Sequence, residues 1–300
     1  MAGKIGRFRT DEARERFLEL YDRAVEELWP VPSEELDVDT SFGTTRVRRS
    51  GQGNRCPLVL VHGNSGTSVG WAPLVVPLTE ERTVLTVDVI GALGRTVQTR
   101  PVAGTEDLAA WFRELLNGLG VERVHLIGFS EGGFVAFHAA LGNADRLASL
   151  VAIDAAGTVE NVRLRFLASM FWTAAKVAVR VPNAMREFGQ RLIPGVELPD
   201  LQWELMTTGA KGFRHALPMP KKLSDEQLSR LATPTLLYMA ANSEVYDARK
   251  AATRARALMP DVEIVIVKGA QHGLPLTHPD RTWADIREFI DRHEPRAEAA

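Results

Sequence analysis

The sequence predicts an α/β protein with a doubly wound, mostly parallel sheet and a helical cap inserted late in the chain. Three observations carry this prediction. Short strands that are apolar throughout alternate with helices, which is typical of a parallel sheet covered on both faces. Right-handed crossovers then place helices on both sides of the sheet. The alternation stops between Gly157 and Lys222.

The elements follow one another in an order that suits this architecture. Apolar residues at helical spacing predict an amphipathic helix over residues 10–29, which Pro30 ends. Two short strands follow at 35–39 and 44–48, on either side of Gly43. Apolar runs then predict strands at 58–61, 84–89, 124–127, 150–153, 235–239 and 264–267, with helices at 105–116, 131–141, 247–258 and 280–291.

The segment that interrupts the alternation is rich in Phe, Trp, Leu and Met and is broken by several prolines. We expect residues 1–156 and 223–300 to form the core, together with the N-terminal helix. Residues 157–222 form the cap, because a long insertion beside a strand end usually covers a site. The alternative is a set of extra core helices without a role in substrate binding.

Composition excludes several classes of protein. The chain has 300 residues, a net charge of −2, 45% hydrophobic and 25% charged residues, which fits a globular protein without a nucleic-acid partner. The longest mostly apolar stretch, residues 166–181, is short for a membrane span and carries Lys176 and Arg180. Charged residues near the start of the chain stand where a signal peptide would have its apolar core, so we expect a cytoplasmic protein. Oligomeric state is not predicted.

The strongest chemical signal is the motif Gly128-Phe129-Ser130-Glu131-Gly132-Gly133. It matches G-x-S-x-G directly after an apolar strand and before a helix, the context of a nucleophile elbow. Small residues are needed two positions before and after the serine, since side chains there would collide with the neighbouring strand and helix. The turn exposes the Ser130 hydroxyl and aims the helix N-terminus at developing negative charge.

A second motif, His62-Gly63-Asn64, ends the first strand of the parallel sheet and opens a loop of small residues. The backbone N–H groups of Asn64 and Glu131 could together form an oxyanion hole. His62 itself is interpreted as a structural hydrogen-bonding residue.

A serine hydroxyl is a weak nucleophile at neutral pH and needs a base within hydrogen-bond reach. His272, in Gly269-Ala270-Gln271-His272-Gly273, lies in the loop after the last strand, at the carboxyl end where open α/β sheets place their sites. We therefore expect it to be the base. The remaining histidines lie in strands, helices, the cap or surface positions: His62, His125, His138, His215, His278 and His293.

The order of HGN, GFSEGG and GAQHGLP resembles the α/β-hydrolase family over about residues 35–293. The N-terminal helix and the run from Asp88 to Pro101 resemble a bacterial subgroup of carboxylesterase-like hydrolases. The resemblance implies the α/β-hydrolase fold and a Ser130 nucleophile. It also implies a structural role for Asp88. No cofactor or metal is expected, because the sequence has neither a metal-spaced His/Cys cluster nor a P-loop.

The acid of the triad is where the sequence departs from the family pattern. The family usually carries it after the strand at 235–239, but the corresponding position is Ser243, followed by Glu244 and, later, Asp247. Some family members carry the acid after the strand that follows the nucleophile helix, and Asp154 stands there. We therefore favour Asp154 as the acid. Glu244, brought into place by a one-residue loop shift, is the main alternative, followed by Asp247 or the absence of a functional acid.

The main functional hypothesis is a serine hydrolase that cleaves an ester, lactone or thioester through an acyl-enzyme. One alternative is a non-hydrolytic enzyme of the same fold, a lyase, cyclase or acyl transferase such as those of secondary metabolism, in which His272 abstracts a proton. Another is a non-catalytic binding protein. An apolar small-molecule acyl substrate is suggested by the large side chains of the cap, Phe166, Met170, Phe171, Trp172 and Trp203.

Overall fold

The computed structural model describes residues 4–295 and is built around one large sheet. Its strands follow the order β11-β10-β8-β7-β4-β5-β3-β2, with β6 (Val97–Gln98) beside β3. The pairs between β11 and β5 are parallel, while β3 runs antiparallel to β5 and β2. The other strands are β2 (Ser33–Thr40), β3 (Gly43–Ser50), β4 (Arg55–Val61), β5 (Arg82–Val87), β7 (Val124–Phe129), β8 (Leu147–Ile153), β10 (Thr235–Ala240) and β11 (Val262–Val267).

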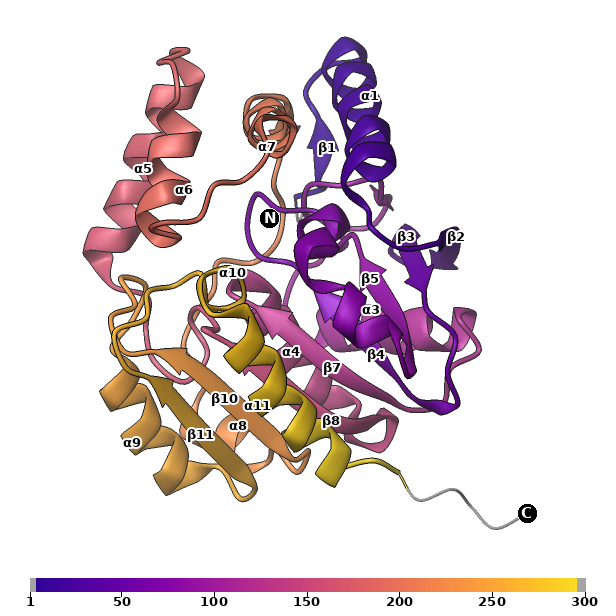
Figure 1. Ribbon diagram of the computed structural model, residues 1–300, viewed down its shortest axis with the longest axis vertical. Helices are drawn as coiled ribbons and strands as arrows, with labels where there is room; N and C mark the ends of the chain where they lie inside the picture. Colours follow the sequence, from indigo (N-terminus) through magenta and orange to yellow (C-terminus); the bar gives the residue numbers. More distant parts are fainter. Residues whose placement is uncertain (1–3, 296–300) are drawn as a thin grey trace.

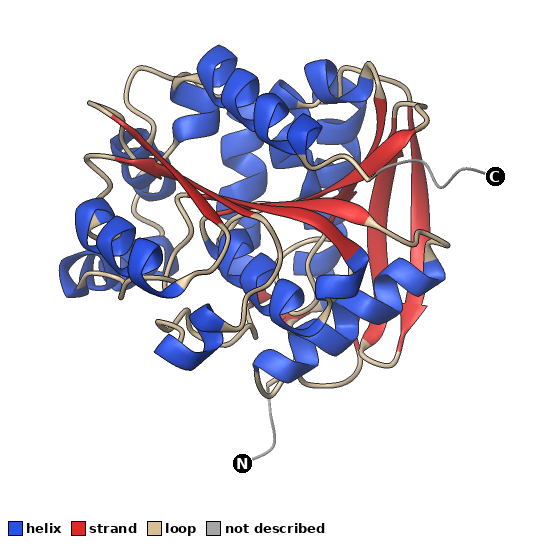
Figure 2. Cartoon of the chain, turned by 90° about the horizontal axis from the view of Figure 1, so that it is seen from below, coloured by secondary structure: helices blue, strands red, loops and turns tan. Residues whose placement is uncertain are grey.

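Helices cover both faces of this sheet, as the view along its edge shows (Figure 2). The helices before the insertion are α1 (Asp11–Leu28), the 3₁₀ helix η1 (Ser68–Leu74), α2 (Val76–Thr79), α3 (Thr105–Gly118), α4 (Glu131–Gly142) and the 3₁₀ turn η2 (Ala144–Arg146). Those that follow are α5 (Leu164–Ala178), α6 (Ala184–Leu192), α7 (Asp200–Gly212), α8 (Asp225–Ser229), α9 (Ala248–Leu258), α10 (Leu274–Thr277) and α11 (Pro279–Arg292).

The apolar strands form two cores because alternate side chains point to opposite faces. In β4, Val59 and Val61 join the core beneath α3, α4, α8 and α9. Leu58 and Leu60 join the core beneath η1, α2, α10 and α11. Burial on both faces explains the continuous apolar runs of the central strands β4 and β8, and the predicted doubly wound α/β fold is confirmed.

The insertion between β8 and β10 folds into α5, α6 and α7, which lie with α1 at one end of the molecule (Figure 1). Helix α1 packs against α7, and α5 and α6 pack against α7 from the other side. The two-residue strands β1 (Arg7–Phe8) and β9 (Phe213–Arg214) pair antiparallel. The N-terminal segment, which was expected to belong to the core, therefore contacts the inserted segment as well.

Among residues 4–295, none of the helices combines the length and apolar character that a membrane crossing requires.

Candidate active site

Ser130 stands at the sharp turn between β7 and α4 and has a left-handed backbone, with φ 55° and ψ −118°. Two glycines make this turn possible. A Cβ at Gly128 would lie 2.4 Å from the carbonyl oxygen of Gly132, and one at Gly132 would lie 2.2 Å from the carbonyl oxygen of Val61. Larger residues at either position would displace the helix or the adjacent strand, which is the physical reason for the G-x-S-x-G spacing.

His272 lies in the loop after β11, with its side chain 5% exposed. Its Nε2 is 2.9 Å from the Oγ of Ser130. The rings of Phe129 and Phe166 lie beside the imidazole, with centroids 5.1 and 6.3 Å from it. His272 is therefore held in an apolar slot between the elbow and α5.

Asp154 directly follows β8 and is fully buried, with φ 44°. Its Oδ2 accepts hydrogen bonds from the Nδ1 of His272 and, at 2.7 Å, from the Oγ of Ser243. Its Oδ1 accepts from the backbone N–H of Ala240 at 3.0 Å and from the hydroxyl of Tyr246 at 2.8 Å. With the Nδ1 proton directed to Asp154, the Nε2 of His272 is free to accept the proton of Ser130.

The other candidate acids lie elsewhere. Glu244 is paired with Arg191 of α6 at 3.1 Å, and its side chain is 37% exposed. Asp247 accepts two backbone N–H groups at the start of α9, each at 3.1 Å, and so caps that helix. Within residues 4–295 neither carboxylate hydrogen-bonds to His272, so this geometry does not support the alternative in which a loop shift brings Glu244 to the base.

Ser243 and Tyr246 were not foreseen as parts of the site. Ser243 occupies the usual position of the acid and instead donates a hydrogen bond to the acid that replaces it. Burial, followed by the charge of Asp154, raises the pKa of Tyr246 well above its usual range, so its hydroxyl remains a donor. The sequence did contain a signal for this arrangement: the usual acid position after β10 carries Ser243, and a carboxylate, Asp154, stands after β8.

The two expected oxyanion donors lie on either side of Ser130. Glu131 begins α4, and Asn64 follows Gly63, where an added Cβ would lie 3.2 Å from the Cβ of Ser130. In the described part of the chain, the backbone N–H groups of Asn64 and Glu131 make no hydrogen bond to protein atoms. They are therefore available to a ligand oxygen.

The side chains of these two residues also meet. Glu131 is 7% exposed, and its Oε2 accepts from the Nδ2 of Asn64 at 3.2 Å. Its Oε1 lies 3.1 Å from the Nε2 of His215, which follows β9. Burial alone would raise the pKa of Glu131, but the charge and hydrogen bond of His215, together with the hydrogen bond of Asn64 and the charge of His62, outweigh it and lower this pKa. Burial opposes the charged form of His215, yet Glu131 leaves the pKa of that histidine raised.

Both ring nitrogens of His62 form hydrogen bonds with the backbone. Its Nε2 accepts the N–H of Val89 at 3.3 Å, so its Nδ1 donates to the carbonyl of Gly63 at 2.9 Å. Burial lowers the pKa of His62, although the charge of Asp88 partly opposes this effect. The neutral ring thus shapes the loop that carries Asn64.

Two apolar cavities border Asn64. One, of about 150 Å³, is lined among others by Trp71, Phe129 and Trp203 and lies under α6 and α7. The other, of about 190 Å³, is lined among others by Met170 and His215. Of the cap side chains expected to face substrate, Phe171 and Trp172 instead lie on the outer face of α5, 68% and 67% exposed.

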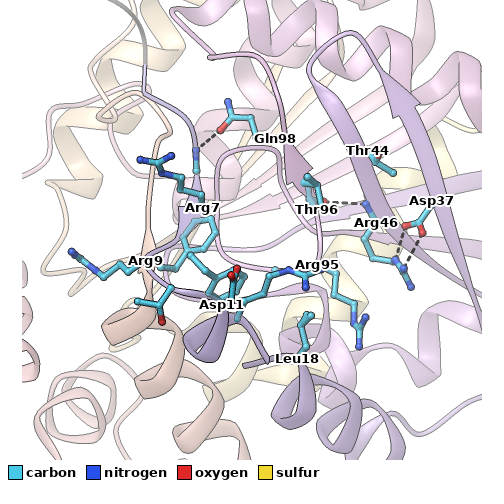
Figure 3. A pocket seen from close by; sticks show the side chains of 17 residues that line it. Arg7, Arg9, Asp11, Leu18, Asp37, Thr44, Arg46, Arg95, Thr96 and Gln98 are labelled. Carbon is cyan, nitrogen blue, oxygen red and sulfur yellow. Dashed lines mark hydrogen bonds and ion pairs between the residues drawn. The ribbon is translucent and has the colours of Figure 1, made fainter. Parts of the chain in front are cut away.

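A polar cavity of about 670 Å³ lies apart from the triad, between α1 and the segment around β6 (Figure 3). Two of its arginines already have carboxylate partners: Arg46 pairs with Asp37 at 2.8 Å, and Arg95 pairs with Asp22. None of the triad residues lines it. Among residues 4–295, no three His, Cys, Asp or Glu side chains are grouped as metal ligands.

Comparisons with known proteins agree with this geometry. The model of the alpha/beta hydrolase family matches residues 58–285. The carboxylesterase YbfK of Bacillus subtilis is 28% identical, with 94% of this chain and 96% of that protein covered. The uncharacterized carboxylesterase nap of the same organism is 28% identical over 92% of each chain. The crystal structure of naproxen esterase from Bacillus subtilis superposes with a TM-score of 0.85 at 25% identity, covering 94% and 99% of the two chains. Since the family model matches well over half of its length, the chain belongs to the alpha/beta hydrolase family.

Proposed function

We propose that this chain is a carboxylesterase that cleaves its substrate through an acyl-enzyme on Ser130. The observation that carries the proposal is the position of His272, which is hydrogen-bonded to Ser130 through one ring nitrogen and to Asp154 through the other. This is the arrangement that activates a serine: the base accepts its proton, while the acid orients the base and stabilises its charged form.

The reaction begins when the Oγ of Ser130 attacks the ester carbonyl and its proton moves to the Nε2 of His272. The carbonyl oxygen becomes an oxyanion, which the N–H groups of Asn64 and Glu131 stabilise. His272 then gives its proton to the leaving alcohol, and the acyl group remains on Ser130. A water molecule, deprotonated by His272, attacks the acyl-enzyme. The bond between the acyl carbon and the Oγ of Ser130 then breaks, His272 returns the proton to Oγ, and the acid is released.

The carboxylesterase relatives support ester cleavage and do not favour a lyase, cyclase or acyl transferase. The triad also argues against a lyase or cyclase, because proton abstraction alone would not need a hydroxyl 2.9 Å from the base. An acyl transferase would use the same acyl-enzyme, so only the relatives argue against that alternative. A thioester or lactone presents the same carbonyl to Ser130, so it remains within the proposed chemistry.

We infer that residues 157–222 act as a cap and that the substrate is largely apolar. Residues of α6 and α7 close the cavity that contains Trp71 and Phe129, and Met170 of α5 lines the other. Both cavities border Asn64, so an ester carbonyl near the oxyanion donors could extend an apolar group into each. A cytoplasmic location remains our expectation.

The proposal is tested with p-nitrophenyl esters of short and medium acyl chains. We expect turnover by the wild type and a loss of kcat of about 10⁶-fold in Ser130→Ala. Unchanged turnover in Ser130→Ala, or no turnover of any such ester by the wild type, would contradict the proposal.

A further inference from the structure

The side chain of Glu131 links the nucleophile turn to two other segments. Its carboxylate accepts from Asn64 on one oxygen and from His215 on the other. The amide of Asn64 is engaged at both ends, because its Oδ1 accepts the Oγ–H of Ser65 at 2.9 Å. The side-chain amide of Asn64 is therefore held between Ser65 and this carboxylate.

His215 is well placed to hold Glu131 because its own backbone is fixed on both sides. Strand β9 immediately before it pairs with β1. The N–H of Ala216, immediately after it, donates to the carbonyl of Gly91 at 2.9 Å. His215 therefore lies in a segment whose backbone is hydrogen-bonded on both sides of it.

The strand that braces this segment is itself anchored (Figure 3). The backbone N–H of Gly6, just before β1, donates to the Oε1 of Gln98 at 2.6 Å. Gly6 also lies so close to Gly91 that an added Cβ would be 2.7 Å from the carbonyl oxygen of Gly91. The contacts therefore run continuously from the N-terminal segment to His215.

The charges around this group suit an ion pair. Glu131 and His215 shift each other's pKa toward the charged forms, against the effect of burial. His62 is another titratable side chain that affects the pKa of Glu131, and its own pKa is lowered by burial against the charge of Asp88. A charged donor and a charged acceptor make a stronger hydrogen bond than neutral groups, so the carboxylate is held firmly.

We propose that His215 and the side chain of Glu131 are positioning residues for ester cleavage, which hold Asn64 so that its N–H faces the oxyanion formed at Ser130. The proposal rests on the proposed function, since it requires the oxyanion hole of Asn64 and Glu131. The competing explanation is a purely structural contact that fastens the cap segment to the core. That contact would affect stability but not the transition state.

The experiment compares His215→Gln, His215→Asn and His215→Leu with wild type on p-nitrophenyl butyrate. The amide nitrogen of glutamine falls near the Nε2 position of histidine, so His215→Gln keeps the donor to Glu131. Asparagine is one methylene too short, and leucine has no donor. His293→Leu is the matched control, because His293 lies at the end of α11 and, within residues 4–295, its Nδ1 hydrogen-bonds to the carbonyl of Phe289 and not to a residue of the site.

We expect kcat to fall about ten- to a hundredfold in His215→Asn and His215→Leu, with a smaller change in KM, because a displaced oxyanion donor weakens only transition-state binding. His215→Gln should stay within about threefold of wild type, and His293→Leu should be unchanged. The affinity for an alkyl boronic acid, which forms a tetrahedral adduct on Ser130, should fall in proportion to kcat/KM. Melting temperatures identify any variant that has lost its fold.

Equal kcat in His215→Gln, His215→Asn and wild type would overturn the inference, as would a loss of stability without a loss of boronic acid affinity. If His215→Leu fails to fold, the comparison of His215→Gln with His215→Asn tests the inference alone. Both variants carry polar side chains, which the partly exposed position of His215 accommodates. Failure of the proposed function is recognised separately, because the wild type would then neither turn over esters nor depend on Ser130.

Discussion

Replacing Asp154 with asparagine removes one charge and changes one atom in the centre of the site. Both Ala240 and Tyr246 donate to the Oδ1 of Asp154, so the asparagine oxygen must stay there. The new NH₂ group then takes the place of Oδ2 and faces the Nδ1 of His272. Two donors cannot face each other, so the imidazole must place its proton on Nε2 and can no longer accept the proton of Ser130.

The wrong tautomer and the lost charge together should lower kcat by about 10⁴-fold, or about 5 kcal/mol of transition-state stabilisation, as in other triad hydrolases. The assay is release of p-nitrophenol from an ester at saturating concentration. Glu244→Gln is the matched control: it loses only an ion pair with Arg191 that is open to solvent, and kcat should change by less than about twofold. The reasoning is refuted if Glu244→Gln loses as much activity as Asp154→Asn.

Three further results are expected. The double variant Asp154→Asn/Ser243→Asp should have a kcat at least about tenfold higher than Asp154→Asn alone. The reason is that Ser243 and His272 both contact the same oxygen of Asp154, so a carboxylate at position 243 could reach the base. Gly132→Ala should lower the free energy of unfolding by about 1–3 kcal/mol, measured by urea denaturation, because its Cβ would lie 2.2 Å from a backbone carbonyl oxygen. The stability difference between wild type and His215→Leu should be greatest between pH 4.5 and 6.5. Because folding lowers the pKa of Glu131, the stability that its charged form contributes is lost as the pH falls through that pKa. Because folding raises the pKa of His215, the stability that its charged form contributes is lost as the pH rises through that pKa.

Each of these results has its own control. Ser243→Asp alone should not raise activity, since Asp154 already serves His272 and a second buried carboxylate is unfavourable. Gly104→Ala should leave stability nearly unchanged, because no atom lies within 4 Å of a Cβ there. A pH-independent difference for His215→Leu would show that the contact with Glu131 does not involve charge.

The parts of the fold that could be predicted from sequence are those with a strong local pattern. The continuous apolar run at 58–61 corresponds to the doubly buried strand β4, and the acidic amphipathic pattern at 10–29 corresponds to α1. Ser130 and His272 could be predicted as site residues because each lies in a loop that follows an apolar run in the sequence. The two-residue pairing of β1 with β9 has no local signal, since it depends on the position of α7 against α1.

The sequence favoured Asp154 as the acid but left Glu244 open, because the choice depends on contacts between distant segments. Asp154 and Ser243 are 89 residues apart and share a hydrogen bond. Whether a carboxylate after β8 or after β10 meets His272 is decided by where the β10–α9 loop places Ser243 and Tyr246. The contact of Glu131 with His215, 84 residues away, was hidden for the same reason.

The central claim, a nucleophilic Ser130 activated by His272, is tested most directly by labelling with a fluorophosphonate and mapping the modified peptide by mass spectrometry. The account predicts one phosphonyl group per chain, located on Ser130, with esterase activity lost in parallel and no labelling of Ser130→Ala or, at the same exposure, of His272→Ala. Labelling at another residue, or full esterase activity in a chain modified at Ser130, would contradict it.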